Sequence, residues 1–564
     1  MKMKRFNFGG LYWLPVALVA GISLAALAVT PKSAEKGALA RNLDIFTAVY
    51  KELNSNYVDS FDAEKGINTA ISAMLDNIDP YTEFYPASDQ DELTMMTSGS
   101  YGGMGSLIME PKRGKGVYIS EPYEGSPSAL AGLRPGDLVV AIDGDTMLTE
   151  SSETVSAKLK GDPGSTFRLT VKRPYTTGDS ILTFDITRQK IVMPSVPYYG
   201  VLGDSIGYIY LTQFTDKAAE SVRKAMEEFK NDRRVRYIVL DLRGNHGGLL
   251  EAAVEIVGMF VPKGTEVLRT RGRGVMDERI YKTVQAPIDT KIPLFVLTDG
   301  QTASSAEIVA GALQDMDRAV IVGNRSFGKG LVQTTRPLPY EGILKVTTAK
   351  YYIPSGRLIQ AIDYSRRNAD GTVARTPDSL TNVYYTKAGR EVRDGGGITP
   401  DVNVTYGDMN RLTYNVVRDN WAFDYATRYR ARHDSIVPAE EFTVTDSMFE
   451  EFKASIDPDK FSYDKVCEQM LAKLKSAAET EGYMNDSVRM EFERMESLLK
   501  HDLNHDLDNN RSDLETILAQ EILKRYYYQR GPIIASLRND PALDSIRTIL
   551  SATGRYNEIL KPKH

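Results

Sequence analysis

Apolar residues recur along this chain at helical spacing in some stretches and in short unbroken runs in others. The first helical stretch has its apolar positions at Leu43, Phe46, Val49, Tyr50 and Leu53. Residues three and four apart share one face of a helix, so this pattern predicts a helical region from about 40 to 89. The Asn-Ile-Asp-Pro sequence at 77–80 is a turn signal within it. Short strands separated by glycines are expected between 101 and 188.

A second pattern follows, in which apolar runs alternate with helical segments. Strands are predicted at 237–240, 294–297 and 319–322, and helices at 249–261 and 304–316. Strand, helix and strand joined by short loops indicate parallel strands with right-handed crossovers. In such a sheet the loops that follow the strands share the carboxyl edge, where ligands usually bind.

Three loops of this predicted sheet are therefore expected to converge, although the first and last are about eighty residues apart. They carry Gly247 and Gly248, then Ser304, and finally Lys329. Beyond Val402 the pattern changes to amphipathic helices rich in Glu and Lys, and we find no catalytic grouping there.

Composition and charge narrow the classes of function. The chain has 564 residues and a net charge of -6, which argues against a nucleic-acid partner. Its single cysteine, Cys467, excludes an intramolecular disulfide and a cysteine metal cluster. His501 and His505 are spaced i, i+4, but the sequence fixes no third ligand. We interpret them as solvated histidines and predict no metal.

The N-terminus carries a targeting signal. Lys2, Lys4 and Arg5 precede an uncharged apolar run at 11–29, which is just long enough to span a bilayer. Positive charges before the run predict that the remainder is exported. We favour an uncleaved anchor in the cell envelope, while Ala-Leu-Ala at 26–28 is also compatible with cleavage.

The segment Gly-Asn-Arg-Ser-Phe-Gly-Lys at 323–329 has the spacing of a phosphate-binding loop. A true loop of this kind continues with Ser or Thr, which holds Mg²⁺, and then with a helix. Here Gly330 follows, and 331–337 is rich in β-branched residues and closes on proline. The sequence thus disfavours a nucleotide site, and we predict no cofactor.

Ser304 stands where a predicted strand turns into a helix, and two interpretations of it are open. With Glu307 three residues later it forms the capping box of an ordinary helix. Its hydroxyl would equally face the sheet edge beside unpaired backbone amides, the position of a strand-turn-helix nucleophile.

A serine nucleophile needs a base, and His246 and Lys329 are the candidates in these loops. A lysine serves when burial lowers its pKa and leaves the amine neutral, and Ser–Lys pairs are a recognised variant. Gln333, four residues further on the predicted strand, is placed to orient that amine. Taken together at one sheet edge, these residues favour a Ser–Lys site.

The ordered set of segments resembles the carboxyl-terminal processing peptidases, also called tail-specific proteases. The resemblance covers about 43–404 and is carried by 74–81, 206–209, 241–248, 302–307, 327–333, 352–357 and 396–401. It implies a serine endopeptidase of an α/β fold with an added PDZ domain, which cuts protein C-terminal tails.

Carried to this chain, the resemblance places the nucleophile at Ser304, the general base at Lys329 and the residue that positions the base at Gln333. The backbone oxyanion donors fall on Ser305 and on Gly247-Gly248. Two departures stand out. The family usually has Ser-Ala-Ser-Ala-Ser where this chain has Thr-Ala-Ser-Ser-Ala at 302–306, so Ser305 remains a second candidate for the nucleophile.

The other departure is His246, which replaces a small residue or proline before the two glycines. It lies next to the expected oxyanion site. We therefore expect its charge to tune activity below neutral pH.

The glycine-rich stretch also fits the resemblance. The sequences at 126–137 and 142–144 resemble a PDZ domain, which adds a peptide strand to a sheet edge and holds its terminal carboxylate on backbone amides. Gly103, Met104 and Gly105 occupy the carboxylate-binding loop, although a plain hairpin turn is the alternative.

The sequence thus predicts a multidomain envelope protease that binds protein tails. We expect an anchor at 1–30, a helical region at 31–94, a PDZ-like domain at 95–188, a parallel α/β peptidase core at 189–403 and an all-helical domain at 404–564. The last is expected to serve homo-oligomerisation, an adaptor or regulator, or closure of the substrate channel. The alternative function is a catalytically silent PDZ scaffold.

Overall fold

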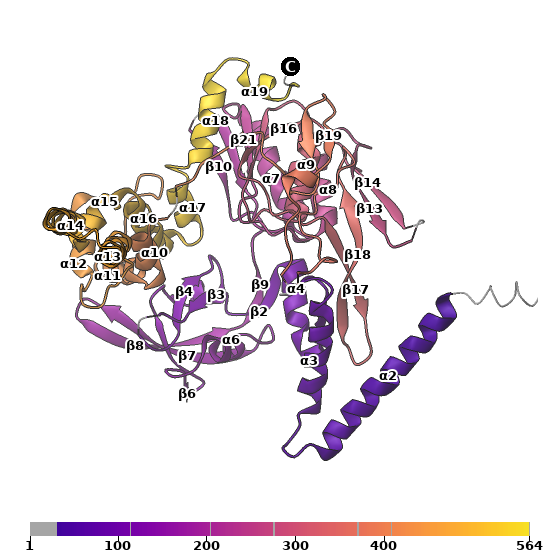
Figure 1. Ribbon diagram of the computed structural model, residues 1–564, viewed down its shortest axis with the longest axis horizontal. Coiled ribbons are helices and arrows are strands. Elements are labelled where there is room, and N and C mark those ends of the chain that lie inside the picture. The colour runs from indigo at the N-terminus through magenta and orange to yellow at the C-terminus, as the bar shows by residue number, and fades with distance from the viewer. Residues whose placement is uncertain are drawn as a thin grey trace, which may run out of the picture. The chain divides into compact units, whose positions relative to one another are not determined.

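The computed structural model describes residues 31–112, 114–203, 205–274, 277–368, 372–407 and 409–562 (Figure 1). The chain divides into two compact units, with the boundary between Phe84 and Tyr85. The predicted anchor at 11–29 lies outside the described residues. Among the helices within the ranges just given, none is long and apolar enough to cross a membrane.

The first unit is mainly helical. Its elements are α2 (Pro31–Asn56), α3 (Ala63–Asp76) and the start of β1 (Glu83–Tyr85). Asp62 caps α3, since its carboxylate accepts a hydrogen bond from the Lys65 amide at 2.9 Å. The Tyr50 hydroxyl donates to the Ala63 carbonyl at 2.7 Å and ties the two helices together. The Asn-Ile-Asp-Pro turn ends α3, as its sequence predicts, but the helical prediction was wrong for the residues between this turn and Ala87, which include strand β1.

A small β domain opens the second unit. Its elements are η1 (Ala87–Asp89), α4 (Gln90–Ser98), β2 (Ser100–Gly103), β3 (Ser106–Met109), β4 (Tyr118–Pro122), α5 (Pro127–Leu130), β5 (Leu138–Ile142), β6 (Asp145–Thr146), α6 (Ser152–Leu159), β7 (Thr166–Tyr175), β8 (Gly178–Thr187) and β9 (Gln189–Val192). The main sheet has the order β3-β4-β5-β7-β8. Phe167, Leu169 and Val171 alternate along β7 and fill its core, as a half-buried strand requires. Strand β3 lies at an edge of this sheet.

The central sheet carries the predicted parallel strands. The elements of this layer are β10 (Tyr198–Leu202), β11 (Ile206–Tyr210), α7 (Ala218–Asn231), β12 (Tyr237–Asp241), α8 (Leu250–Gly258), β15 (Leu294–Thr298), α9 (Ser305–Asp315), β16 (Ala319–Gly323) and β21 (Val402–Asn403). The strand order is β10-β11-β12-β15-β16-β21; β10 is antiparallel and the others are parallel. The strands and helices predicted from the apolar runs are present within a few residues.

A second, antiparallel sheet was not predicted. Four of its five strands, β14, β13, β18 and β17, lie in that order, and a small hairpin follows them in the chain. These elements are β13 (Glu266–Gly272), β14 (Glu278–Lys282), β17 (Leu331–Pro337), β18 (Ile343–Tyr352), η2 (Asp378–Leu380), β19 (Val383–Tyr385) and β20 (Glu391–Arg393). The chain leaves the central sheet at β16 and enters this second sheet at β17, so the loop between them joins two sheets.

The rest of the chain is helical. The helices are α10 (Arg411–Arg418), α11 (Trp421–Arg432), α12 (Asp446–Ser455), α13 (Val466–Thr480), α14 (Asp486–Leu499), α15 (Leu503–Asn509), α16 (Arg511–Tyr527), α17 (Arg530–Ser536), α18 (Pro541–Ser551) and α19 (Arg555–Ile559). Many of their buried residues belong to the same apolar cluster as Val239 and Phe295 of the central sheet. The neighbouring residues Ile238 and Val296 point to the other face, against α7, α8 and α9. The C-terminal helices therefore cover one face of the central sheet.

Candidate active site

The glycine loop after β12 is held by one buried side chain, Asn245. Its Nδ2 donates to the Leu211 carbonyl at 2.8 Å, and its Oδ1 accepts from the Gly247 amide at 2.8 Å. Its own carbonyl accepts from the amide of Ala303 at 2.9 Å. The residue just before Ser304 is thus tied directly to the glycine loop, as the convergence of loops predicts.

Ser304 occupies a strained turn between β15 and α9. Its φ is 55° and its ψ is -118°, a combination that residues with a Cβ rarely adopt. An ordinary N-cap residue has an extended backbone instead. Strain of about 1–3 kcal/mol persists only where neighbours fix the backbone, and it is typical of functional sites and of strand-turn-helix nucleophiles.

The carboxylate of Glu307 links the Ser304 turn to the Lys329 loop. Its Oε2 accepts hydrogen bonds from the Ser304 amide at 2.9 Å and from the Lys329 amide at 2.8 Å. Its Oε1 accepts from the Gly328 amide at 2.7 Å and from the Ser326 hydroxyl. Two amides that share one oxygen atom must be neighbours, so Ser304 and Lys329 lie side by side at the backbone.

A second bridge joins the same two residues through their carbonyl groups. The hydroxyl of Tyr351 lies 2.7 Å from the Lys329 carbonyl oxygen and 3.2 Å from that of Ser304. Tyr351 belongs to β18 and is 1% exposed. Tyr351 is not among the residues predicted from the sequence, because no local motif links a strand tyrosine to loops that lie earlier in the chain.

Burial is the largest influence on the pKa values of Glu307 and Tyr351, the two side chains that bridge Ser304 and Lys329. It raises the pKa of Glu307 to about 7, although the four donors around the carboxylate act in the opposite direction. Burial, with the nearby Glu307, raises the pKa of Tyr351 well above its usual value. The tyrosine is therefore neutral at physiological pH and remains a hydrogen-bond donor.

The predicted oxyanion residues lie against the predicted nucleophile. A Cβ atom at Gly247 would come within 2.8 Å of the Ser304 Cβ and 2.9 Å of the Ser305 amide nitrogen. At Gly248 it would meet the Phe214 carbonyl oxygen at 2.3 Å. Both positions require glycine for this close approach. The amide of Gly247 already donates to Asn245, which leaves Gly248 and Ser305 as the better placed donors.

The two neighbouring serines have different surroundings. The Ser305 hydroxyl is buried and donates to the Gly248 carbonyl at 2.8 Å, so it braces the glycine loop. Ser304 is half-buried. This difference favours Ser304 over Ser305 as the nucleophile.

Gln333 lies on β17, four residues beyond the half-buried Lys329. Its Nε2 donates to the hydroxyl of Thr347 on β18 at 3.1 Å, next to an irregularity in the pairing of these strands. The predicted interaction between Gln333 and the lysine amine remains a prediction. His246 is exposed beside the glycine loop.

A buried ion cluster stands at the end of β12, and the sequence analysis did not single it out. Arg243 pairs with Asp241 at 2.5 Å and with Asp540, the N-cap of α18, at 2.6 Å. The Tyr208 hydroxyl donates to Asp241 at 2.6 Å. Burial disfavours the charged guanidinium, but the two carboxylates outweigh it and raise the pKa of Arg243. This cluster connects the glycine loop to the C-terminal helices.

The predicted carboxylate-binding loop joins β2 to the edge strand β3. Gly103 pairs with Gln189 of β9, and Met104 is buried in the core of the β domain. The Gly105 carbonyl accepts from the Ser126 and Ser128 hydroxyls at 2.8 and 2.6 Å.

The Met104 carbonyl accepts from the Ser128 amide at 2.9 Å. A trans peptide unit points its N–H away from its C=O. The amides of Gly105 and Ser106 therefore point away from these serines.

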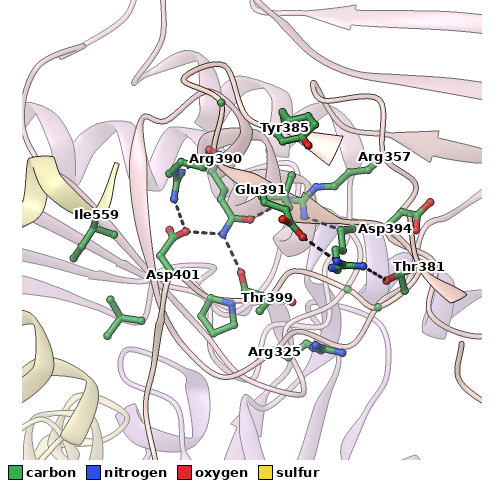
Figure 2. Close-up of a pocket in the computed structure, with 18 of the residues that line it drawn as sticks. Arg325, Arg357, Thr381, Tyr385, Arg390, Glu391, Asp394, Thr399, Asp401 and Ile559 are labelled. Carbon is green, nitrogen blue, oxygen red and sulfur yellow. Dashed lines mark hydrogen bonds and ion pairs between the residues drawn. The ribbon is translucent and has the colours of Figure 1, made fainter. Parts of the chain in front are cut away.

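A cavity of about 1000 Å³ is lined by Gln314 near the C-terminal end of α9, whereas Ser304 precedes the opposite end of this helix. Figure 2 shows the charged side chains that line this cavity. Each arginine that lines it already pairs with a carboxylate: Arg325 with Asp378, Arg357 with Asp315, Arg390 with Asp317 and Asp401, Arg393 with Glu391, and Arg555 with Glu558. These pairs explain the charges without a ligand. The described residues contain no group of three or more His, Cys, Asp or Glu side chains that could hold a metal ion.

Three family models match separate parts of the chain. Residues 205–366 match "Peptidase family S41", residues 118–173 match "PDZ domain", and residues 412–550 match "Probable PDZ-protease, C-terminal helical domain". These matches confirm that the chain contains a peptidase core, a PDZ domain and a C-terminal helical domain, as predicted from the sequence.

Curated relatives agree with these matches. A carboxy-terminal-processing protease of Bartonella bacilliformis is 36% identical over 57% of this chain and 73% of its own length. A probable CtpA-like serine protease of Staphylococcus haemolyticus is 29% identical over 84% of this chain and 94% of its own length. Among solved structures, a photosystem II D1 C-terminal processing protease is 29% identical, covers 64% of this chain and 86% of its own, and superposes with a TM-score of 0.35.

Proposed function

The chain belongs to peptidase family S41 as a serine-type carboxyl-terminal processing peptidase, and from this premise we propose that Ser304 and Lys329 form its catalytic pair. The observation that carries the proposal is the double bridge between their backbones, through Glu307 and Tyr351. Two loops separated by 25 residues are brought to one place, and one of them holds a serine in a strained turn.

The proposed reaction follows from this placement. Neutral Lys329 accepts the proton of the Ser304 hydroxyl, and Oγ attacks the carbonyl carbon of the peptide bond. The amides of Ser305 and of Gly248 stabilise the oxyanion. The intermediate collapses to an acyl-enzyme as the protonated lysine gives its proton to the leaving amine. Water then attacks the ester, and the acid product leaves. Gln333 orients the lysine amine.

The PDZ domain is proposed to capture the substrate. An extended tail adds to the free edge of β3, and its terminal carboxylate accepts from backbone amides of the 103–105 loop, chiefly from that of Gly105. Gly103 and Met104 shape the loop from behind. Apolar tail residues are preferred, because β3 lies beside α6, whose Val155 and Leu159 belong to the apolar core of the domain.

The proposal also includes the cellular location of the enzyme and the role of its C-terminal helices. The apolar run at 11–29 anchors the chain in the envelope, with the peptidase on the extracytoplasmic, periplasmic side. The C-terminal helices serve self-association or docking of an adaptor. We retain the domain limits proposed from the sequence, with the PDZ domain at 95–188 and the peptidase core at 189–403.

The experiment that tests the mechanism follows cleavage of an unfolded protein with an apolar C-terminus by the purified chain, beside Ser304→Ala and Lys329→Ala. Both variants are expected to lose activity by at least about 10³-fold, because nucleophile and base act as one unit. Ser305→Ala is the matched control and is expected to keep most of the activity. Cleavage by Lys329→Ala at the normal rate would exclude the lysine as base. Without cleavage by the unmodified chain, the silent scaffold becomes the better explanation.

A further inference from the structure

We propose that Tyr351 is a positioning residue for the Ser304–Lys329 pair, an inference that rests on the proposed function. Proton transfer between two side chains requires their atoms to lie within hydrogen-bond reach, and a misplacement of about 1 Å costs roughly 100-fold in rate. The two residues sit on different loops. Something other than local chain connectivity must therefore fix their separation.

The Tyr351 hydroxyl meets this requirement. It has one proton to donate and two carbonyl oxygens within reach, at 2.7 Å from Lys329 and 3.2 Å from Ser304. Its phenol is fully buried, so water does not replace it as a donor. A hydrogen bond shared between the two carbonyls fixes each residue relative to the other.

The tyrosine itself is mounted on a rigid element. Strand β18 is paired with β13 on one side, where Tyr351 faces Thr270, and with β17 on the other. The Tyr351 amide also donates to the Gly330 carbonyl at 3.0 Å, directly beside Lys329. Ring and backbone of one residue thus hold the Lys329 loop at two successive carbonyls.

Glu307 and Tyr351 act on complementary groups. The Glu307 carboxylate accepts hydrogen bonds from the amides of Ser304 and Lys329, and the Tyr351 hydroxyl lies within hydrogen-bond distance of their carbonyl oxygens. With both in place, the strained Ser304 backbone is fixed at both ends. Removal of the tyrosine hydroxyl leaves only the amide side of this clamp.

The test is Tyr351→Phe in the full chain, which removes the hydroxyl and keeps the buried ring. Tyr352→Phe is the matched control, since it makes the same change one residue further on β18, where the ring stacks on Arg271 at 4.7 Å. For each protein, kcat and KM are measured on a quenched fluorescent peptide with an apolar C-terminus. Circular dichroism gives the melting temperature, and activities are compared at a temperature where all three proteins are folded.

We expect Tyr351→Phe to lower kcat by roughly 10- to 100-fold, with KM within about twofold of the unmodified chain. Tyr352→Phe is expected to change neither. A kcat of Tyr351→Phe within twofold of normal overturns the inference, as does a rise in KM at constant kcat. Failure of the Ser–Lys mechanism gives a different result, namely activity in Lys329→Ala.

Discussion

Glu307 shows at the scale of a single residue why two interpretations of one motif are compatible. Its carboxylate accepts the Ser304 amide, as the third residue of a capping box does. The same carboxylate accepts the amides of Gly328 and Lys329, which lie more than twenty residues further along the chain. Capping of α9 and assembly of the site are thus one set of hydrogen bonds.

Stability at this residue is expected to depend on pH. Because the pKa of Glu307 is raised to about 7 in the folded chain, the folded state binds its proton more tightly than the unfolded state does. Protonated Glu307 contributes fully to the free energy of unfolding below its pKa in the unfolded chain, near 4.5. About 3 kcal/mol of this contribution is lost as the pH rises through 7.

Melting temperatures of the unmodified chain and of Glu307→Gln from pH 5 to pH 8 test this expectation. The variant puts an amide NH₂ group against backbone donors and is expected to be the less stable protein. The difference in melting temperature should shrink as pH rises, because Glu307 of the unmodified chain must ionise at a buried position and glutamine does not ionise. A difference that is constant across this range would contradict the assignment.

The proposed binding site for the tail depends on the order of secondary-structure elements. The edge position of β3 is a property of the whole sheet order, since β4 covers one side only. Gly105, just before β3, has φ of 76° and lies against Ser126. The Met104 and Gly105 carbonyls face Ser126 and Ser128, so the Gly105 amide points away from these serines at the start of the edge strand. The proposed binding geometry therefore depends on the loop and the strand together.

Gly105→Ala is expected to weaken tail binding by about tenfold or more. The new Cβ would lie 2.4 Å from the Ser126 Cβ, so the loop must move in addition to bearing the left-handed strain. Gly125→Ala is the control, because Gly125 has nearly the same φ, 73°, with no atom within 4 Å. Binding of a labelled apolar tail to the Ser304→Ala protein, followed by fluorescence anisotropy, measures both. Equal losses in the two variants would argue against the loop as the binding site.

At the scale of the whole molecule, the C-terminal helices share an apolar cluster with the central sheet of the peptidase core. Val239, Phe295 and Val320 of the central sheet share one apolar cluster with Leu412 and Trp421. Burying a large apolar side chain is worth about 1.5–3 kcal/mol, so uncovering this face removes a large part of the stability. The Arg243–Asp540 ion pair adds a buried link between the two parts.

A chain that ends at residue 406 is consequently expected to be insoluble or unfolded, and not a smaller active enzyme. Replacement of the α13–α14 hairpin, 466–499, by a short Gly-Ser linker is the control. That hairpin buries only Leu471 and Phe492 among its described residues, and its helices are antiparallel neighbours. The control should melt within a few degrees of the unmodified chain. Solubility and circular dichroism distinguish the two cases, and a folded, active 1–406 chain would refute the shared core.

The sequence by itself determined the parallel strands of the core, because their apolar runs are buried on both faces and need no distant partner to be recognised. It likewise determined that the loops of Gly247, Ser304 and Lys329 share one edge, since right-handed crossovers leave no other arrangement. Only the tertiary structure decided how these loops are locked together. Tyr351 and the covering of the sheet by C-terminal helices depend on contacts between residues far apart in the chain, and local periodicity carries no record of such contacts.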